Sequence, residues 1–327
     1  MTTLDHLNMK IISLSISMLL LPMSLYSADN HLHMANGVKI GEVDSSSAIL
    51  WTRLTKTEER NVDGKLFSTK HTKKMRSEPY GALEKMEGSV PGVSGEVSLH
   101  YWPKGRKADA IQTAWVSVDP EKDFTQQIKV NDLLAGETYA FTLEGRKTEK
   151  DAVAVSVNGG FRTAPSAGTI APIRFGVVTC QDYPRRDDPL NGHKIYHEMA
   201  ADDLDFFVHA GDILYYDKPG PYADNEELAR FKWNRIFSLP YQRNFHNHTS
   251  SYFMKDDHEL LKNDAWPGQK YGDLTWEQGL AVFREQVPMG EKTYRTVRWG
   301  KDLQVWMVEG RDFRSDNTMK DGPNKTI

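Results

Sequence analysis

From residue 37 to residue 163, short runs of alternating apolar and polar residues are separated by Gly, Pro, Asp or Asn. Such alternation is typical of strands with one buried face, because successive side chains of a strand point to opposite faces. This half of the chain therefore predicts an all-β sandwich, and the polar, lysine-rich stretch 55–88 predicts a long insertion or loop. We expect its strands at 46–51, 97–102, 112–118 and 139–143.

Beyond residue 171 the pattern changes to strands that alternate with helices, which predicts a layered α/β domain. Thr275 and Gln278 predict a capping box at the start of the last helix. We expect strands at 173–178, 206–210 and 303–308, helices at 226–237 and 274–287, and a helical stripe of Ile195, Tyr196 and Met199. The predicted organisation is a sandwich domain at 33–163, a linker at 164–171 and an α/β domain at 172–327.

The composition is that of a globular protein. The chain has 327 residues, of which 39% are hydrophobic and 26% are charged, and it is long enough for two domains. Its net charge of −4 provides no basic field that would hold a phosphate backbone, and the basic run at 70–76 predicts a solvated loop. We expect a monomer that has no nucleic acid as a specific partner.

Residues 1–28 have the pattern of an export signal peptide. Lys10 precedes an apolar run at 11–21, and the small residues at 27–28 offer a cleavage site. The run is too short for a transmembrane helix, so we expect a periplasmic or extracellular protein without a stable membrane anchor. A buried N-terminal helix is the alternative. The two candidate start residues are Met1 and Met9.

Carboxylates and a histidine crowd together between residues 256 and 264. The run Asp-Asp-His-Glu at 256–259 is followed by Asn-Asp at 263–264. Such a cluster repels itself in a folded protein unless cations or a solvated loop compensate for it. Because open α/β sheets place their sites at the carboxyl ends of strands, ligand-type residues after two other predicted strands make a metal site the favoured interpretation. Those residues are Cys180, Asp212 and Tyr215.

Cys180 is the only cysteine of the chain, so it makes no internal disulfide. As a ligand it would supply a thiolate. As a small buried residue after a strand it would need no ligand role, and both interpretations stay open. Asp212 is the residue we expect to bridge two cations, because a carboxylate has two oxygens to offer.

Five segments, in this order, resemble the PhoD-like alkaline phosphatase D family of metallophosphoesterases. They are Ala-Ile-Leu-Trp-Thr-Arg-Leu at 48–54, Thr-Cys-Gln-Asp-Tyr at 179–183, Gly-Asp-Ile-Leu-Tyr-Tyr at 211–216, Asp-Asp-His-Glu with Asn-Asp at 256–264, and Val-Glu-Gly-Arg-Asp-Phe-Arg at 308–314. The resemblance extends from about residue 37 to residue 327 and implies a sandwich followed by a metallophosphoesterase domain. Because the family continues with further strands that carry histidine and aspartate ligands, we expect this domain to be incomplete and truncated at the C-terminus.

The segment that ends at Tyr139 resembles the corner of fibronectin III and Ig-like sandwiches, where a tyrosine hydroxyl bonds to nearby backbone. We therefore expect a fibronectin III/Ig-like N-terminal sandwich. A plain strand aromatic is the alternative for Tyr139.

The resemblance also implies a site for two metals. Thiolate and phenolate stabilise ferric iron whereas carboxylates and amides suit calcium, so Fe³⁺ and Ca²⁺ are implied, with zinc or manganese as alternatives. His258 would bind the phosphate or protonate the leaving oxygen. Arg311 would clamp a phosphate, unless it serves only in a structural salt bridge. The implied metal ligands are Cys180, Asp212, Tyr215, Asp257 and Asn263.

The expected function is that of an exported, metal-dependent phosphoesterase, an alkaline phosphatase or phosphodiesterase that hydrolyses phosphate esters. The alternatives are a phospholipase-D-like phosphodiesterase and an inactive truncated chain that acts only as a binding module. The substrate class depends on the residues that form the walls of the pocket, and the sequence alone does not identify them.

Overall fold

The computed structural model describes residues 32–67 and 80–326. The predicted export signal and the basic run at 70–76 lie outside these residues. The described residues belong to one compact unit. Within the described ranges, no helix combines the length and the apolar character that crossing a bilayer requires.

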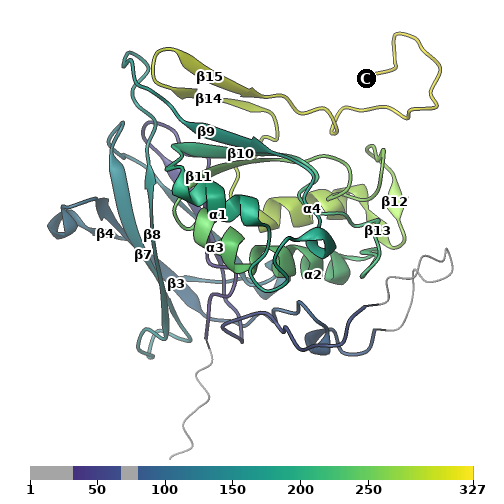
Figure 1. The fold of residues 1–327 in the computed structure, drawn as a ribbon, viewed down its shortest axis with the longest axis horizontal. Coiled ribbons are helices and arrows are strands. Elements are labelled where there is room, and N and C mark those ends of the chain that lie inside the picture. The colour runs from purple at the N-terminus through teal and green to yellow at the C-terminus, as the bar shows by residue number, and fades with distance from the viewer. Residues whose placement is uncertain (1–31, 68–79, 327) are drawn as a thin grey trace, which may run out of the picture. The chain divides into compact units, whose positions relative to one another are not determined.

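Two large sheets form the framework (Figure 1). The first has the strand order β6 (Thr125–Val130), β2 (Ala48–Arg53), β1 (Val38–Gly41), β11 (Ser250–Met254), β10 (Phe206–Ala210) and β9 (Phe175–Val178). The second has the order β4 (Ile111–Gln112), β3 (Glu96–Pro103), β7 (Thr138–Arg146) and β8 (Val155–Arg162), and β5 (Val116–Ser117) also pairs with β3.

Helices and hairpins complete the described fold. The α-helices are α1 (Lys194–Ala201), α2 (Glu226–Phe237), α3 (Pro240–His246) and α4 (Trp276–Gln286). The hairpins pair β12 (Lys270–Tyr271) with β13 (Leu274–Thr275) and β14 (Arg295–Trp299) with β15 (Leu303–Met307). The short 3₁₀ helices are η1 (Leu83–Lys85), η2 (Lys107–Asp109), η3 (Pro120–Lys122) and η4 (Tyr183–Arg185).

The N-terminal strands pack around a shared apolar core, as their alternating pattern predicts. Ile40 and Leu50 from one sheet join Leu99 and Leu143 from the other, and all four side chains are buried. The strands expected near 46–51, 97–102 and 139–143 are confirmed as β2, β3 and β7. The strand expected at 112–118 is wrong in part, because two short strands, β4 and β5, take its place.

Tyr139 forms the expected corner. Its ring is buried, and its hydroxyl accepts a hydrogen bond from the Leu134 N–H at 2.9 Å. The bond ties the loop before β7 to the start of that strand. The fibronectin III or Ig-like identity of the sandwich stays a prediction.

The second half of the chain is layered α/β, as its pattern predicts. Phe207 of β10 packs against α1 and α3, whereas the ring centroid of the preceding Phe206 lies 4.8 Å from that of Trp299 of β14. The helices therefore lie on one face of the sheet and the β14–β15 hairpin lies on the other (Figure 1). In α1, Tyr196 and Met199 are buried as expected, but Ile195 is exposed, so that part of the predicted stripe is wrong.

A parallel pairing joins the two halves of the chain. Ile40 of β1 pairs with Ser250 of β11, so the N-terminal strands extend the sheet of the α/β half. Strands from before and after the expected linker at 164–171 therefore belong to one continuous sheet. The division into domains at 33–163, 164–171 and 172–327 stays a prediction.

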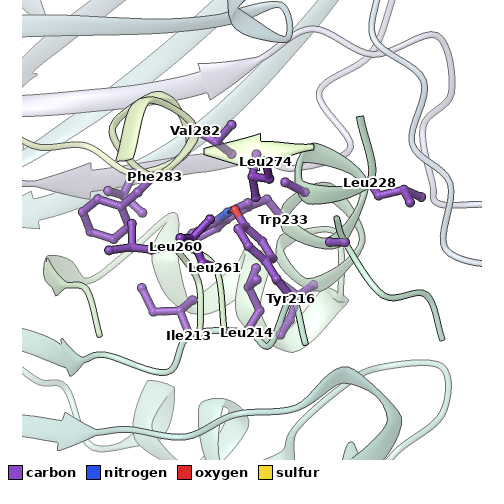
Figure 2. Close-up of a cluster of buried hydrophobic side chains, with 14 of the residues drawn as sticks. Ile213, Leu214, Tyr216, Leu228, Trp233, Leu260, Leu261, Leu274, Val282 and Phe283 are labelled. Carbon is purple, nitrogen blue, oxygen red and sulfur yellow. Dashed lines mark hydrogen bonds between the residues drawn. The ribbon is translucent and has the colours of Figure 1, made fainter. Parts of the chain in front are cut away.

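A large apolar core lies beneath the loops that follow β10 and β11 (Figure 2). Tyr216 and Leu260, from these two loops, are buried together with Trp233 of α2, whose indole N–H donates to the Tyr216 hydroxyl at 2.7 Å. Thr275 and Gln278 form the expected capping box at the start of α4. This packing holds both loops in place.

Replacement of Tyr139 by phenylalanine should lower the free energy of unfolding by about 1 kcal/mol, because the Leu134 N–H loses its acceptor while the ring remains. Urea unfolding measures this difference. The same change at the exposed Tyr294 is the matched control, with an expected effect within about 0.5 kcal/mol. Equal stability of the Tyr139→Phe variant and the parent would contradict a stabilising corner.

Candidate metal centre

Three loops with predicted ligands leave neighbouring parallel strands. β10 pairs in parallel with β9 on one side and with β11 on the other. Cys180 follows β9, Asp212 follows β10 and Asp257 follows β11. Because carboxyl ends of parallel strands meet at one edge of a sheet, this topology brings the three loops together.

Two of these loops adopt backbone conformations that side chains disfavour. Cys180 has φ of 61° and Asp212 has φ of 51°, both in the left-handed region. At Gly211, with φ of 103°, an added Cβ would lie 2.7 Å from Cβ of Asp256. The Gln181 N–H donates to the Asp212 carbonyl at 3.0 Å, which locks the two loops together. Such strain persists where the surroundings enforce it, and it is concentrated at functional sites.

Asp212, Asp257 and His258 offer ligand atoms that all lie within 4.8 Å of one another. Asp212 Oδ2 accepts hydrogen bonds from the Tyr215 hydroxyl at 3.1 Å and from the Cys180 thiol at 3.4 Å. Asp212 Oδ1 is buried and has no hydrogen-bond partner among the described residues. A buried carboxylate oxygen left unpaired is costly, and a cation would satisfy it. The donor set therefore fits a metal.

His258 is oriented by a carboxylate that sequence reasoning missed. Its Nδ1 lies 2.7 Å from Asp217 Oδ1, and its ring centroid lies 4.5 Å from that of Tyr215. Burial lowers the pKa of His258, but the hydrogen bond and the charge of Asp217 outweigh burial and raise it. Because Nδ1 is engaged, Nε2 is the ring nitrogen left for contact with a substrate.

The other predicted site residues lie at the rim of this cluster. The Asn263 side chain donates to Asp264 at 2.8 Å, and its role as a metal ligand stays a prediction. Arg311 donates to Asp256 and lies 3.4 Å from Asp257 Oδ1. Burial raises the pKa of Asp257, and the charge of Asp256 raises it further. This direction agrees with the expected repulsion within the acidic run, and the charge of Arg311 opposes the shift.

A buried ion cluster fixes the segment that carries Arg311. Lys255 Nζ lies 2.8 Å from Glu309 Oε1 and 2.7 Å from Asp312 Oδ1, and only 1% of the Lys255 side chain is exposed. Glu309 also accepts the Arg311 N–H at 2.5 Å. Sequence reasoning missed Lys255 and Glu309, and the only local signal was a lysine directly before the acidic run.

Comparisons with known proteins give one family for both halves of the chain. The profile of the PhoD-like phosphatase N-terminal domain matches residues 23–165, and that of the PhoD-like phosphatase matches residues 175–327. No curated protein sequence matches.

Two solved structures share the fold. The structure of PhoD aligns with a TM-score of 0.65 and 16% identity, over 91% of this chain and 55% of that one. The purple acid phosphatase PPD1 from yellow lupin (Lupinus luteus) seeds aligns with a TM-score of 0.51 and 11% identity, over 83% of this chain and 43% of that one. The chain thus spans about half the length of each of these two structures.

Replacement of Lys255 by methionine should lower the free energy of unfolding by about 3 kcal/mol, because it leaves Glu309 as a buried carboxylate without its cation. Denaturant unfolding measures the loss. The exposed Lys270 provides the control, since its methionine variant should change stability by no more than about 0.5 kcal/mol. Similar stabilities of the two variants would mean that the ion cluster does not hold the Arg311 segment.

Proposed function

The chain belongs to the PhoD-like phosphatase family, and we propose that it hydrolyses phosphate esters at the centre formed by Asp212, Asp257 and His258. The observation that carries the proposal is the buried Asp212 Oδ1, which lacks a hydrogen-bond partner among the described residues at the point where the three strand-end loops meet. The likeness to the two solved structures supports the fold on which this centre is built.

The centre would hold two metals, with Asp212 between them. Cys180 and Tyr215 converge on Asp212 Oδ2, and a thiolate and a phenolate there would favour ferric iron. Asp257 and Asn263 would favour calcium. Bound cations would supply an activated water and stabilise charge on the phosphate oxygens. A ferric centre with these ligands absorbs visible light, so a colourless protein with stoichiometric iron would contradict the Cys180 and Tyr215 assignments.

His258 and Arg311 would act on the substrate. Asp217 holds His258 Nδ1 and favours the protonated ring, so Nε2 would carry a proton to the leaving oxygen of the ester. Arg311 has a planar set of donors that suits two phosphate oxygens. Its position beside Asp257, fixed through Glu309, would keep the guanidinium next to the bound phosphate.

The proposal extends to the location, the N-terminal domain and the oligomeric state of the protein. Residues 1–28 would direct export to the periplasm or the exterior, and the N-terminal half would form a fibronectin III/Ig-like sandwich at 33–163. The protein would act as a monomer. A phospholipase-D-like phosphodiesterase is the second candidate activity, and turnover of a phospholipid rather than of p-nitrophenyl phosphate would favour it.

Replacement of Asp212 by asparagine should remove one anionic oxygen from the centre while preserving its size. We expect loss of bound metal and a fall in p-nitrophenyl phosphate and bis-ester hydrolysis of roughly 100-fold or more. Metal analysis and steady-state kinetics measure both effects, and the exposed Asp302 provides an Asp→Asn control that should change neither.

Full metal content and turnover in the Asp212→Asn variant would contradict the proposed centre. A parent chain that holds its metals but turns over neither ester would contradict the proposed hydrolysis and leave a binding protein.

A further inference from the structure

A cavity of about 280 Å³ borders the metal centre. Cys180 and Tyr215, two proposed ligands, form part of its wall, so a group in the cavity would lie beside a phosphate bound at the centre. Gln181, His193 and Lys218 also line it. We call this cavity the Gln181 pocket.

Gln181 lines this wall and carries an amide whose orientation one hydrogen bond fixes. Only 8% of the residue is exposed, and its Oε1 accepts from the Tyr196 hydroxyl at 2.8 Å. That bond orients the amide, because the carbonyl end must face Tyr196. The amide nitrogen Nε2 is buried and has no hydrogen-bond partner within residues 32–67 and 80–326. A buried N–H₂ group without an acceptor is costly, so the pocket favours an occupant that offers one.

The charges around the pocket also favour an occupant rich in oxygen. Lys218 Nζ and Arg185 Nε lie 3.7 Å and 3.9 Å from the same carboxylate oxygen, Asp182 Oδ2. Two cations thus lie beside one carboxylate, and Lys218 Nζ also lies 3.3 Å from the centroid of the Tyr215 ring. His193 adds no charge at neutral pH, because burial lowers its pKa and the Gln242 amide lies 2.7 Å from its Nδ1.

We propose that the Gln181 pocket binds the esterified group of the substrate and selects groups that carry hydroxyl or carbonyl oxygens. The inference rests on the proposed function, since the phosphate of that substrate would occupy the adjacent centre. Oxygens of the esterified group would accept hydrogen bonds from Gln181 Nε2 and from Lys218. Gln181 is then a residue that determines specificity, and an alkyl ester of equal size would leave its amide unpaired.

Phosphonates test this selection, because their C–P bond resists hydrolysis during a binding measurement. Calorimetric titration of the metal-loaded chain would compare 3-hydroxypropylphosphonate with butylphosphonate, which has the same number of heavy atoms. Methylphosphonate, which is too short to fill the pocket, reports on the metal centre alone. We expect the hydroxylated ligand to bind about tenfold more tightly than the butyl ligand, as one additional hydrogen bond allows.

Two variants distinguish loss of the Gln181 amide donor from loss of the folded structure. Gln181→Met preserves length and removes the amide, and Gln181→Glu preserves an acceptor for Tyr196 but removes the donor. In both variants the tenfold preference should fall to about onefold while methylphosphonate affinity stays unchanged. Circular dichroism and melting temperature verify that each variant is folded.

Equal affinity of the parent for the two longer phosphonates would overturn the pocket assignment, as would a preference that survives in both variants. Failure of methylphosphonate to bind the metal-loaded parent would contradict the proposed function itself, and the pocket assignment with it. Binding of methylphosphonate without any preference between the longer ligands would contradict the pocket alone.

Discussion

The parallel pairing of β9, β10 and β11 is the constraint on which the rest of the site depends. It places three loops at one sheet edge and so brings Asp212 of the β10 loop next to Asp257 of the β11 loop. The core beneath, with Tyr216 and Leu260 packed against Trp233, prevents the loops from moving apart. The fold therefore holds carboxylates that repel one another close together. Burial strengthens this repulsion because the protein interior screens charge less than water does.

Protein cations compensate only part of this charge. Arg311 serves Asp256 and Asp257, and Arg314 lies 3.2 Å from Asp264, whereas Asp212 Oδ1 has no hydrogen-bond partner in the described part of the chain. Lys255 pairs with Glu309 and Asp312 of the C-terminal segment. The buried lysine thus positions the segment that carries Arg311, and in the proposed centre a bound cation would pair with Asp212.

The hydrophobic pattern within a segment predicted those strands and helices whose own residues specify them. The strand at 206–210 and the helix at 226–237 were placed to the residue as β10 and α2. β11 was missed, because the buried Ser250 and Ser251 hide its apolar pattern, and α3 is too short for a helical period. Candidate ligands on strand ends could be inferred from topology, whereas Asp217, Lys255 and Gln181 acquire their partners from distant segments. A contact between residues so far apart in the sequence produces no recognisable pattern in either segment by itself.

Anomalous X-ray scattering from crystals of the metal-loaded chain tests the central claim most directly. The account predicts a metal peak within about 2.0–2.6 Å of oxygen atoms of both Asp212 and Asp257, with an iron signal on the side of Cys180 and Tyr215. A metal bound elsewhere, with no peak next to Asp212 Oδ1, would contradict it.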